Sequence, residues 1–303
     1  MMNALRACGI AVLCAASCLP AAAANRPIKL WPGEAPGPKA TSKPEVNTTK
    51  PSDNLVAGKP VIRLGNVTSP EMTFYPAPAA KNTGAAVLVF PGGGYHILAL
   101  DLEGTEVCSW LNSIGVNALL VKYRVPTPEG VARYQEPLED AQRAIGLTRQ
   151  HAKEWKIDPK RVGVIGFSAG GNLAAVMSTN FDKRVYSPVD EADQQSARPD
   201  FVILIYPAYL VTPPDLNQIA PELHITADTP PTFLVQAEDD PVHMENSLFY
   251  YLALKRAKVP AEMHLYPKGG HGYGLRRTDL TITTWPARAD DWMRSLGVLK
   301  KAH

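Results

Sequence analysis

The feature that most constrains this chain is a serine held between two glycines where a strand pattern gives way to a helix pattern. Residues Val162–Ile165 suit a buried strand, and Asn172–Ser178 begins a helical run of small and apolar residues. Between them stands Gly-Phe-Ser-Ala-Gly at 166–170, with Ser168 at its centre. This G-x-S-x-G pattern predicts a sharp strand-to-helix turn that exposes the serine hydroxyl. The alternative is an ordinary turn in which Ser168 caps the helix.

Segments that suit buried strands alternate along the chain with helical patterns. Strands are expected at Ala85–Phe90, Val116–Lys122, Val162–Ile165, Phe201–Tyr206, Thr232–Gln236 and Ala261–Tyr266. Helices are expected at Asp101–Asn112, Glu136–Trp155, Asn172–Ser178, Glu245–Ala257 and Trp285–Leu296. Two shorter strands, Val61–Leu64 and Met72–Tyr75, are expected to form an antiparallel edge pair. This alternation predicts an α/β fold with a mainly parallel sheet, whose functional groups gather at the carboxyl ends of the strands.

The first 24 residues have the pattern of a secretory signal peptide. Arg6 precedes the apolar run Ala7–Leu19, and small residues follow as far as Ala24. The run is short for a membrane span, so we expect cleavage near Ala24, a secreted or periplasmic protein and no stable membrane insertion. A lipid anchor on Cys18 is a minor alternative, as is an N-terminal helix of the fold itself.

Composition excludes several classes of protein. The net charge of +2 and the absence of a basic cluster interleaved with aromatics argue against nucleic-acid binding. Cys8, Cys14 and Cys18 all precede Ala24, so the mature chain would keep only Cys108 and no internal disulfide. Cys108 lies in an apolar helical pattern and is interpreted as a small core residue.

The remaining chain is interpreted as an arm followed by one domain. Residues 25–60 are rich in Pro, Gly, Thr and Lys and predict an extended arm, with Trp31 as an anchor onto the body. Residues 61–303 are expected to form a single catalytic domain. The proline-containing segment 211–230 is expected to form a small lid or substrate wall above the sheet.

A serine hydroxyl needs a histidine to take its proton, and His271 is the strongest candidate. It lies in Lys-Gly-Gly-His-Gly-Tyr-Gly at 268–274, directly after the last expected strand, where glycines let the loop fold back toward Ser168. The alternative is a polar loop residue. The chain has no H-E-x-x-H pattern or Cys/His cluster, so neither a metal nor another cofactor is predicted.

The acid that orients the histidine should follow the strand Thr232–Gln236, where Glu238, Asp239 and Asp240 stand in a row. Asp239 is favoured because the spacing Asp-x-x-Val places its carboxylate in the turn and the valine at the start of the following packing. Asp240 is the alternative, since one residue of slip in a turn is hard to exclude, and Glu238 is less favoured. A solvated acidic turn would also give this pattern.

Acyl transfer also needs N–H donors aimed at the oxyanion that develops on the substrate. Gly-Gly-Gly at 92–94 follows an apolar strand, where an oxyanion loop is expected, although Pro91 replaces the histidine common before such a loop. Gly93, Gly94 and Ala169 are the expected donors. A triple glycine alone is often a flexible turn, but here the order is glycine loop, serine, acid, histidine.

With these segments in place, the chain resembles the α/β-hydrolase superfamily over residues 85–297. Phe90–Tyr95, Gly166–Gly171 and Pro267–Gly272 look like the corresponding segments of secreted bacterial carbohydrate esterases, especially the acetylxylan-esterase-like group. Trp-Pro-Gly at 31–33 is also similar to the opening of those proteins.

The resemblance implies a Ser-His-Asp esterase that hydrolyses O-acetyl esters on plant-type polysaccharide or its oligosaccharides. Tyr95 and His96 would border the substrate pocket, and Asp140 and Arg143 would be structural supports. The expected partner is therefore an acetylated carbohydrate, and no oligomeric state is predicted.

Three rival functions share parts of this pattern. A feruloyl or other small carboxyl esterase would use the same residues. A prolyl-oligopeptidase-like peptidase has a similar fold and triad order, but the roughly 60 residues before the sheet are too few for the propeller that such enzymes usually carry. The non-enzymatic rival is an inactive hydrolase fold used for binding.

Overall fold

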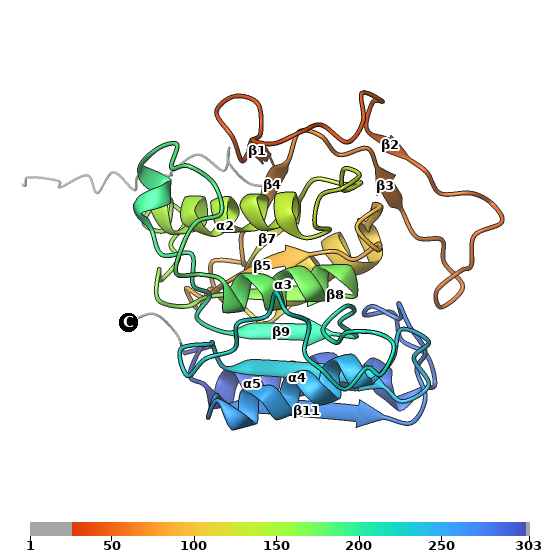
Figure 1. Cartoon of the computed structure of the whole chain (residues 1–303). Coiled ribbons are helices and arrows are strands. Elements are labelled where there is room, and N and C mark those ends of the chain that lie inside the picture. The colour runs from red at the N-terminus through yellow and green to blue at the C-terminus, as the bar shows by residue number, and fades with distance from the viewer. Residues whose placement is uncertain (1–25, 301–303) are drawn as a thin grey trace, which may run out of the picture.

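The computed structural model of the chain describes residues 26–300 (Figure 1). The expected signal peptide, its cleavage site at Ala24 and the lipid-anchor alternative at Cys18 lie outside the described residues. Within the described part, no helix is both long and apolar enough to cross a membrane.

An eight-stranded sheet forms the centre of the fold, in the order β1-β4-β7-β5-β8-β9-β10-β11. Its strands are β1 (Pro27–Lys29), β4 (Glu71–Tyr75), β5 (Ala86–Phe90), β7 (Asn117–Lys122), β8 (Val162–Phe167), β9 (Val202–Ile205), β10 (Thr232–Ala237) and β11 (Ala261–Tyr266). The strands from β7 to β11 pair in parallel, while β4 and β1 are antiparallel at one edge. The mainly parallel sheet predicted from the sequence is confirmed.

Helices cover both faces of the sheet and bury alternate residues of its strands. The helices are α1 (Glu106–Ser113), α2 (Gln135–Gln150), α3 (Ala169–Thr179), α4 (Glu245–Arg256) and α5 (Trp285–Ser295). On one face α2, α3 and α4 pack over residues such as Leu88 and Val164, and on the other α1 and α5 pack over Val87 and Ile165 (Figure 1). Burial on both faces explains the largely uninterrupted apolar character of the central strands.

The expected edge pair of strands is wrong. β3 (Arg63–Gly65) pairs with β2 (Val46–Asn47) and β6 (Ile97–Ala99) in a separate small sheet, whereas β4 lies between β1 and β7. The two predicted strands therefore belong to different sheets. The reason is that β4 buries Met72 and Phe74 in the main core, which requires it to continue the large sheet.

Two expected helices also differ in form. The segment expected as a helix from Asp101 begins as the π-helical turn η2 (Asp101–Thr105) and becomes regular only in α1. Helix α2 ends at Gln150, and the residues after it form turns, in which Lys156 has a φ of 55°. Short 3-10 turns, η3 (Glu191–Gln194) and η4 (Thr281–Thr284), complete the described elements.

The arm runs along the β1–β4 edge of the sheet and is fixed to α2 (Figure 1). Trp31 is buried, and its indole N–H donates to Asp140 Oδ1 at 2.8 Å. Arg143 Nε donates to the Leu30 carbonyl at 2.8 Å. The predicted anchor at Trp31 is confirmed, and Asp140 and Arg143 have the structural contacts expected of them.

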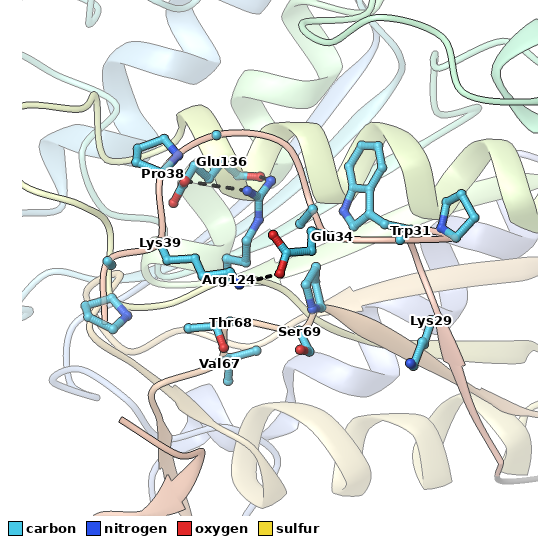
Figure 2. Close-up of a pocket in the computed structure, with 17 residues that line it drawn as sticks. Lys29, Trp31, Glu34, Pro38, Lys39, Val67, Thr68, Ser69, Arg124 and Glu136 are labelled. Carbon is cyan, nitrogen blue, oxygen red and sulfur yellow. Dashed lines mark hydrogen bonds and ion pairs between the residues drawn. The ribbon is translucent and has the colours of Figure 1, made fainter. Parts of the chain in front are cut away.

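Between the arm and α2 lies a cavity of about 390 Å³ (Figure 2). Glu136 lines it with a side chain only 4% exposed, and its Oε1 has no hydrogen-bond partner although Arg124 Nη1 lies 3.5 Å away. Arg124 also pairs with Glu139 and Asp140, so three carboxylates share one guanidinium. Burial, the largest effect, raises the pKa of Glu136 to about 7.

Replacing Glu136 by glutamine is expected to stabilise the protein increasingly as pH rises. The pKa of Glu136 rises from 4.5 to about 7 on folding. The favourable contribution of this carboxyl to the free energy of unfolding is therefore complete below about pH 4.5 and is lost as pH rises through 7. Glutamine cannot ionise and escapes this loss. We expect the melting temperature of Glu136→Gln, relative to wild type, to increase by about 2–4 °C between about pH 5 and pH 8.

Differential scanning calorimetry across this pH range measures the effect. Glu129→Gln, which removes an exposed carboxylate, is the matched control and should show no such trend. A difference between Glu136→Gln and wild type that stays constant with pH would contradict the prediction.

Candidate active site

Ser168 is the single residue between β8 and α3. Its φ of 51° and ψ of −117° place it in a backbone region that non-glycine residues rarely adopt, at a cost of about 1–3 kcal/mol. The side chain makes no capping bond to α3; instead Ser168 Oγ lies 2.7 Å from His271 Nε2. The geometry is thus that of a half-buried serine presented to a histidine rather than that of a helix cap.

Two glycines are needed for the close packing around this turn. A Cβ on Gly170 would overlap the carbonyl oxygen of Phe90, so the start of α3 lies directly on the end of β5. A Cβ on Gly92 would stand 2.6 Å from the Phe167 carbonyl oxygen and 2.8 Å from Ser168 Cβ. Glycine at these positions therefore lets the loop after β5 pass beside the serine.

His271 is oriented by Asp240. Its Nδ1 lies 2.8 Å from Asp240 Oδ2, while its Nε2 faces Ser168. The Asp240 carboxylate is buried and also accepts from Gln236 Nε2 and the Val242 N–H, each at 2.7 Å. These donors fix the carboxylate in the direction of the imidazole, as a triad acid requires.

The prediction that Asp239 contacts His271 is wrong. Asp239 is exposed and accepts from the N–H groups of Gly269 and Gly270, at 2.9 Å and 2.7 Å. The chain turns one residue later than the Asp-x-x-Val spacing suggested, because Asp240 rather than Asp239 points back into the protein. The hydrogen bond from Gly270 is the largest of the effects that lower the pKa of Asp239. Asp239 therefore holds the loop that carries His271.

The expected oxyanion donors differ from the neighbouring Gly92 in their hydrogen bonding. Gly92 N–H is engaged, donating to Glu103 Oε2 at 2.6 Å. Within residues 26–300, the N–H groups of Gly93, Gly94 and Ala169 donate to no protein acceptor. They are available to a substrate oxygen, and their role as an oxyanion site stays a prediction.

The two residues expected to border the substrate differ in placement. Tyr95 is 1% exposed and donates from its hydroxyl to Asn172 Oδ1 at 2.8 Å, so most of the ring belongs to the core. His96 is exposed, and both residues line a cavity of about 460 Å³ that also reaches Gly94.

Sequence reasoning missed a buried carboxylate that connects the two loops of the site. Glu103, on η2, accepts from Gly92 N–H through one oxygen and from the Tyr206 hydroxyl, at 2.8 Å, through the other. The Tyr206 hydroxyl in turn accepts from Gly274 N–H at 3.0 Å, in the segment after His271. Burial raises the pKa of Glu103. The only signal in the sequence was a glutamate within an apolar helical pattern.

Glu103→Gln is expected to lower kcat more than it changes KM. The amide offers one acceptor where the carboxylate offers two, so either Gly92 N–H or the Tyr206 hydroxyl loses its partner and the glycine loop shifts. Loss of one such buried bond predicts a decrease of about 10- to 100-fold in kcat. Steady-state kinetics on p-nitrophenyl acetate test this, with Glu129→Gln, at an exposed position, as control. An unchanged kcat would show that this network does not position the loop.

Comparisons with known proteins agree with the fold. A family with the alpha/beta hydrolase fold matches residues 87–226, and the prolyl oligopeptidase family matches residues 211–296. The crystal structure of an acetyl ester-xyloside bifunctional hydrolase from Caldicellulosiruptor lactoaceticus is 33% identical, with a TM-score of 0.71, and the match covers 91% of this chain and 97% of that one.

Several curated relatives are named as esterases. An acetylxylan esterase of Xylanibacter ruminicola is 30% identical over 71% of this chain and 45% of its own length. Carboxylesterase NlhH of Mycobacterium tuberculosis is 27% identical over 77% of this chain and 78% of its own. The chain spans less than half the length of the acetylxylan esterase.

The chain belongs to the α/β-hydrolase family as an acetylxylan-esterase-like member, because it is 33% identical to a solved relative that it matches over 97% of that relative's length.

Proposed function

We propose that this chain is a serine carboxylic ester hydrolase that removes O-acetyl groups from plant-type polysaccharide or its oligosaccharides. The observation that carries the proposal is the continuous contact from Ser168 Oγ to His271 Nε2, at 2.7 Å, and from His271 Nδ1 to Asp240, at 2.8 Å. These distances suit proton transfer from the serine to an oriented base. The acetylated-carbohydrate specificity is supported by the esterase relatives.

The first half of the reaction forms an acetyl-enzyme. His271 takes the hydroxyl proton of Ser168 through Nε2 while Oγ attacks the acetyl carbonyl carbon. Asp240 holds the imidazole in the tautomer with Nδ1 protonated and stabilises the imidazolium that forms. The N–H groups of Gly93, Gly94 and Ala169 receive the negative charge that develops on the carbonyl oxygen. The sugar oxygen then leaves with the proton from His271.

The second half of the reaction releases acetate. His271 takes a proton from water, which attacks the acetyl carbon, and the ester bond to Ser168 Oγ breaks as the serine regains a proton from His271. The enzyme returns to its starting state without any other reactant.

Acetate release from a substrate panel tests the proposal. We expect the purified wild type to release acetate from acetylated xylan and acetylated xylo-oligosaccharides. It should act far more slowly on feruloylated arabinoxylan and on a proline-containing peptide, which tests the peptidase similarity of residues 211–296. Ser168→Ala should reduce every ester activity by at least about 10³-fold without changing the melting transition substantially. Activity retained in Ser168→Ala would refute the assigned nucleophile, and preferred peptide cleavage would favour a peptidase.

Two neighbouring variants test the assigned acid. Asp240→Asn should lower kcat by about 10⁴-fold, because an asparagine favours the wrong imidazole tautomer. Asp239→Asn keeps an oxygen acceptor for Gly269 and Gly270 and should cost less than about 10-fold. Circular dichroism checks that both variants fold. The reverse order of effects would return the acid role to Asp239.

A further inference from the structure

Two cavities, one of which reaches the glycine loop, share three of their lining residues. The cavity of about 460 Å³ extends to Gly94, and a second, of about 490 Å³, extends to the turn after Asp240. Both are lined by Arg133, Tyr209 and Glu222. Each cavity is far larger than an acetyl group, so these side chains face space suited to the rest of a substrate.

Arg133 is held in place by stacking rather than by a charge pair. Its Cζ lies 4.1 Å from the centroid of the Tyr209 ring, a cation–π contact. In the part of the chain that the structure describes, the guanidinium of Arg133 donates no hydrogen bond and has no carboxylate within 4.0 Å. By contrast, Arg124 and Arg276 each pair with carboxylates. The five N–H donors of Arg133 are therefore available to a ligand.

The stack beneath Arg133 leads to the catalytic turn. The Tyr209 ring stacks on Tyr95, with centroids 6.3 Å apart and planes at 24°. Asn172, on the helix that begins after Ser168, accepts from the Tyr95 hydroxyl and donates to the Tyr209 carbonyl oxygen at 3.1 Å. The Tyr209 hydroxyl also points toward Gly94, lying 3.9 Å from the position that a Cβ there would occupy. Arg133 is thus connected through packed residues to the helix that begins after Ser168.

A planar guanidinium with free donors binds a carboxylate through two parallel hydrogen bonds. The cation–π contact with Tyr209 restrains this group before a ligand binds, which reduces the entropy lost on binding. Glu222, which lines the same two cavities, supplies acceptors suited to hydroxyl groups and opposes an anion. An anionic sugar ring presents both kinds of group.

We propose that Arg133 is a specificity-determining residue that binds the carboxylate of a uronic acid in the substrate, so that the enzyme prefers acetylated oligosaccharides carrying an acidic sugar. The inference rests on the proposed function, since it concerns the carbohydrate side of the same ester.

Paired substrates test this inference. The probes are acetylated xylo-oligosaccharides with and without a glucuronic acid substituent. We expect wild type to show a higher kcat/KM on the acidic substrate. Arg133→Gln should lower the ratio of acidic to neutral kcat/KM by about 10- to 100-fold, mainly through KM. Arg133→Lys should lower it less, since it keeps the charge and loses the two-pronged geometry. Arg256→Gln, an exposed position on α4, is the matched control and should leave the ratio unchanged.

Glu222→Gln provides a test of opposite sign. Removing this carboxylate should raise the acidic-to-neutral ratio by about 2- to 5-fold, because it relieves repulsion of the bound anion. The same ratio in wild type, Arg133→Gln and Glu222→Gln would overturn the inference. The inference would also be overturned if Arg133→Gln affected only the hydrolysis of p-nitrophenyl hemisuccinate. Arg133 would then bind a carboxylate on the acyl group of the substrate, not one on the sugar.

Failure of this inference is distinguishable from failure of the proposed function. A wild type that releases acetate from both oligosaccharides, with a ratio insensitive to Arg133, refutes only the carboxylate site. A wild type that hydrolyses p-nitrophenyl acetate but neither oligosaccharide refutes the carbohydrate specificity and, with it, this inference.

Discussion

The site depends on how closely two backbone segments approach each other at the end of β5. Helix α3 begins against the Phe90 carbonyl oxygen, with no room for a side chain on Gly170, and the following loop passes Ser168 with no room for one on Gly92. This contact places Gly92 of the glycine loop directly beside the serine. The strained backbone of Ser168 persists because the residues on both sides of it are buried and packing holds them in place.

Buried polar groups hold the two loops of the site in register. Asp240 at the end of β10 and Glu103 beside β5 are both removed from water, which is costly for a carboxylate unless its oxygens are bonded. Each has donors on both oxygens: Gln236 and Val242 with His271 for Asp240, and Gly92 with Tyr206 for Glu103. The hydrogen bonds that offset the cost of burying these two carboxylates therefore also position the loops that they contact.

Much of the fold, and two of the three candidate triad residues, could be predicted from the sequence, because strand periodicity and the G-x-S-x-G turn are local signals. Ser168 and His271 are brought together as expected. The aspartate that contacts His271 was mispredicted, because sequence does not determine which of two adjacent aspartates points inward in a turn. Glu103 and Arg133 were missed because their contacts are made with residues distant in the sequence. Glu103 accepts a hydrogen bond from Gly92, and Arg133 lies over the ring of Tyr209. The wrong pairing of β3 with β4 has the same origin, since the sequence of a strand does not determine which sheet it joins.

The π-helical turn at Asp101–Thr105 gives the site an unusual sensitivity to chain length. A π-turn contains one residue more per turn than an α-helix, and this wider turn carries Glu103 to its position beneath the glycine loop. Deleting one residue there would let the segment continue α1 as a regular α-helix. The residues before the deletion would then be rotated about the helix axis by about 100° relative to α1. The glycine loop would then lose its buried support from Glu103 although Ser168, His271 and Asp240 all remained. The length of this turn therefore constrains the site as directly as the identity of the residues around Ser168 does.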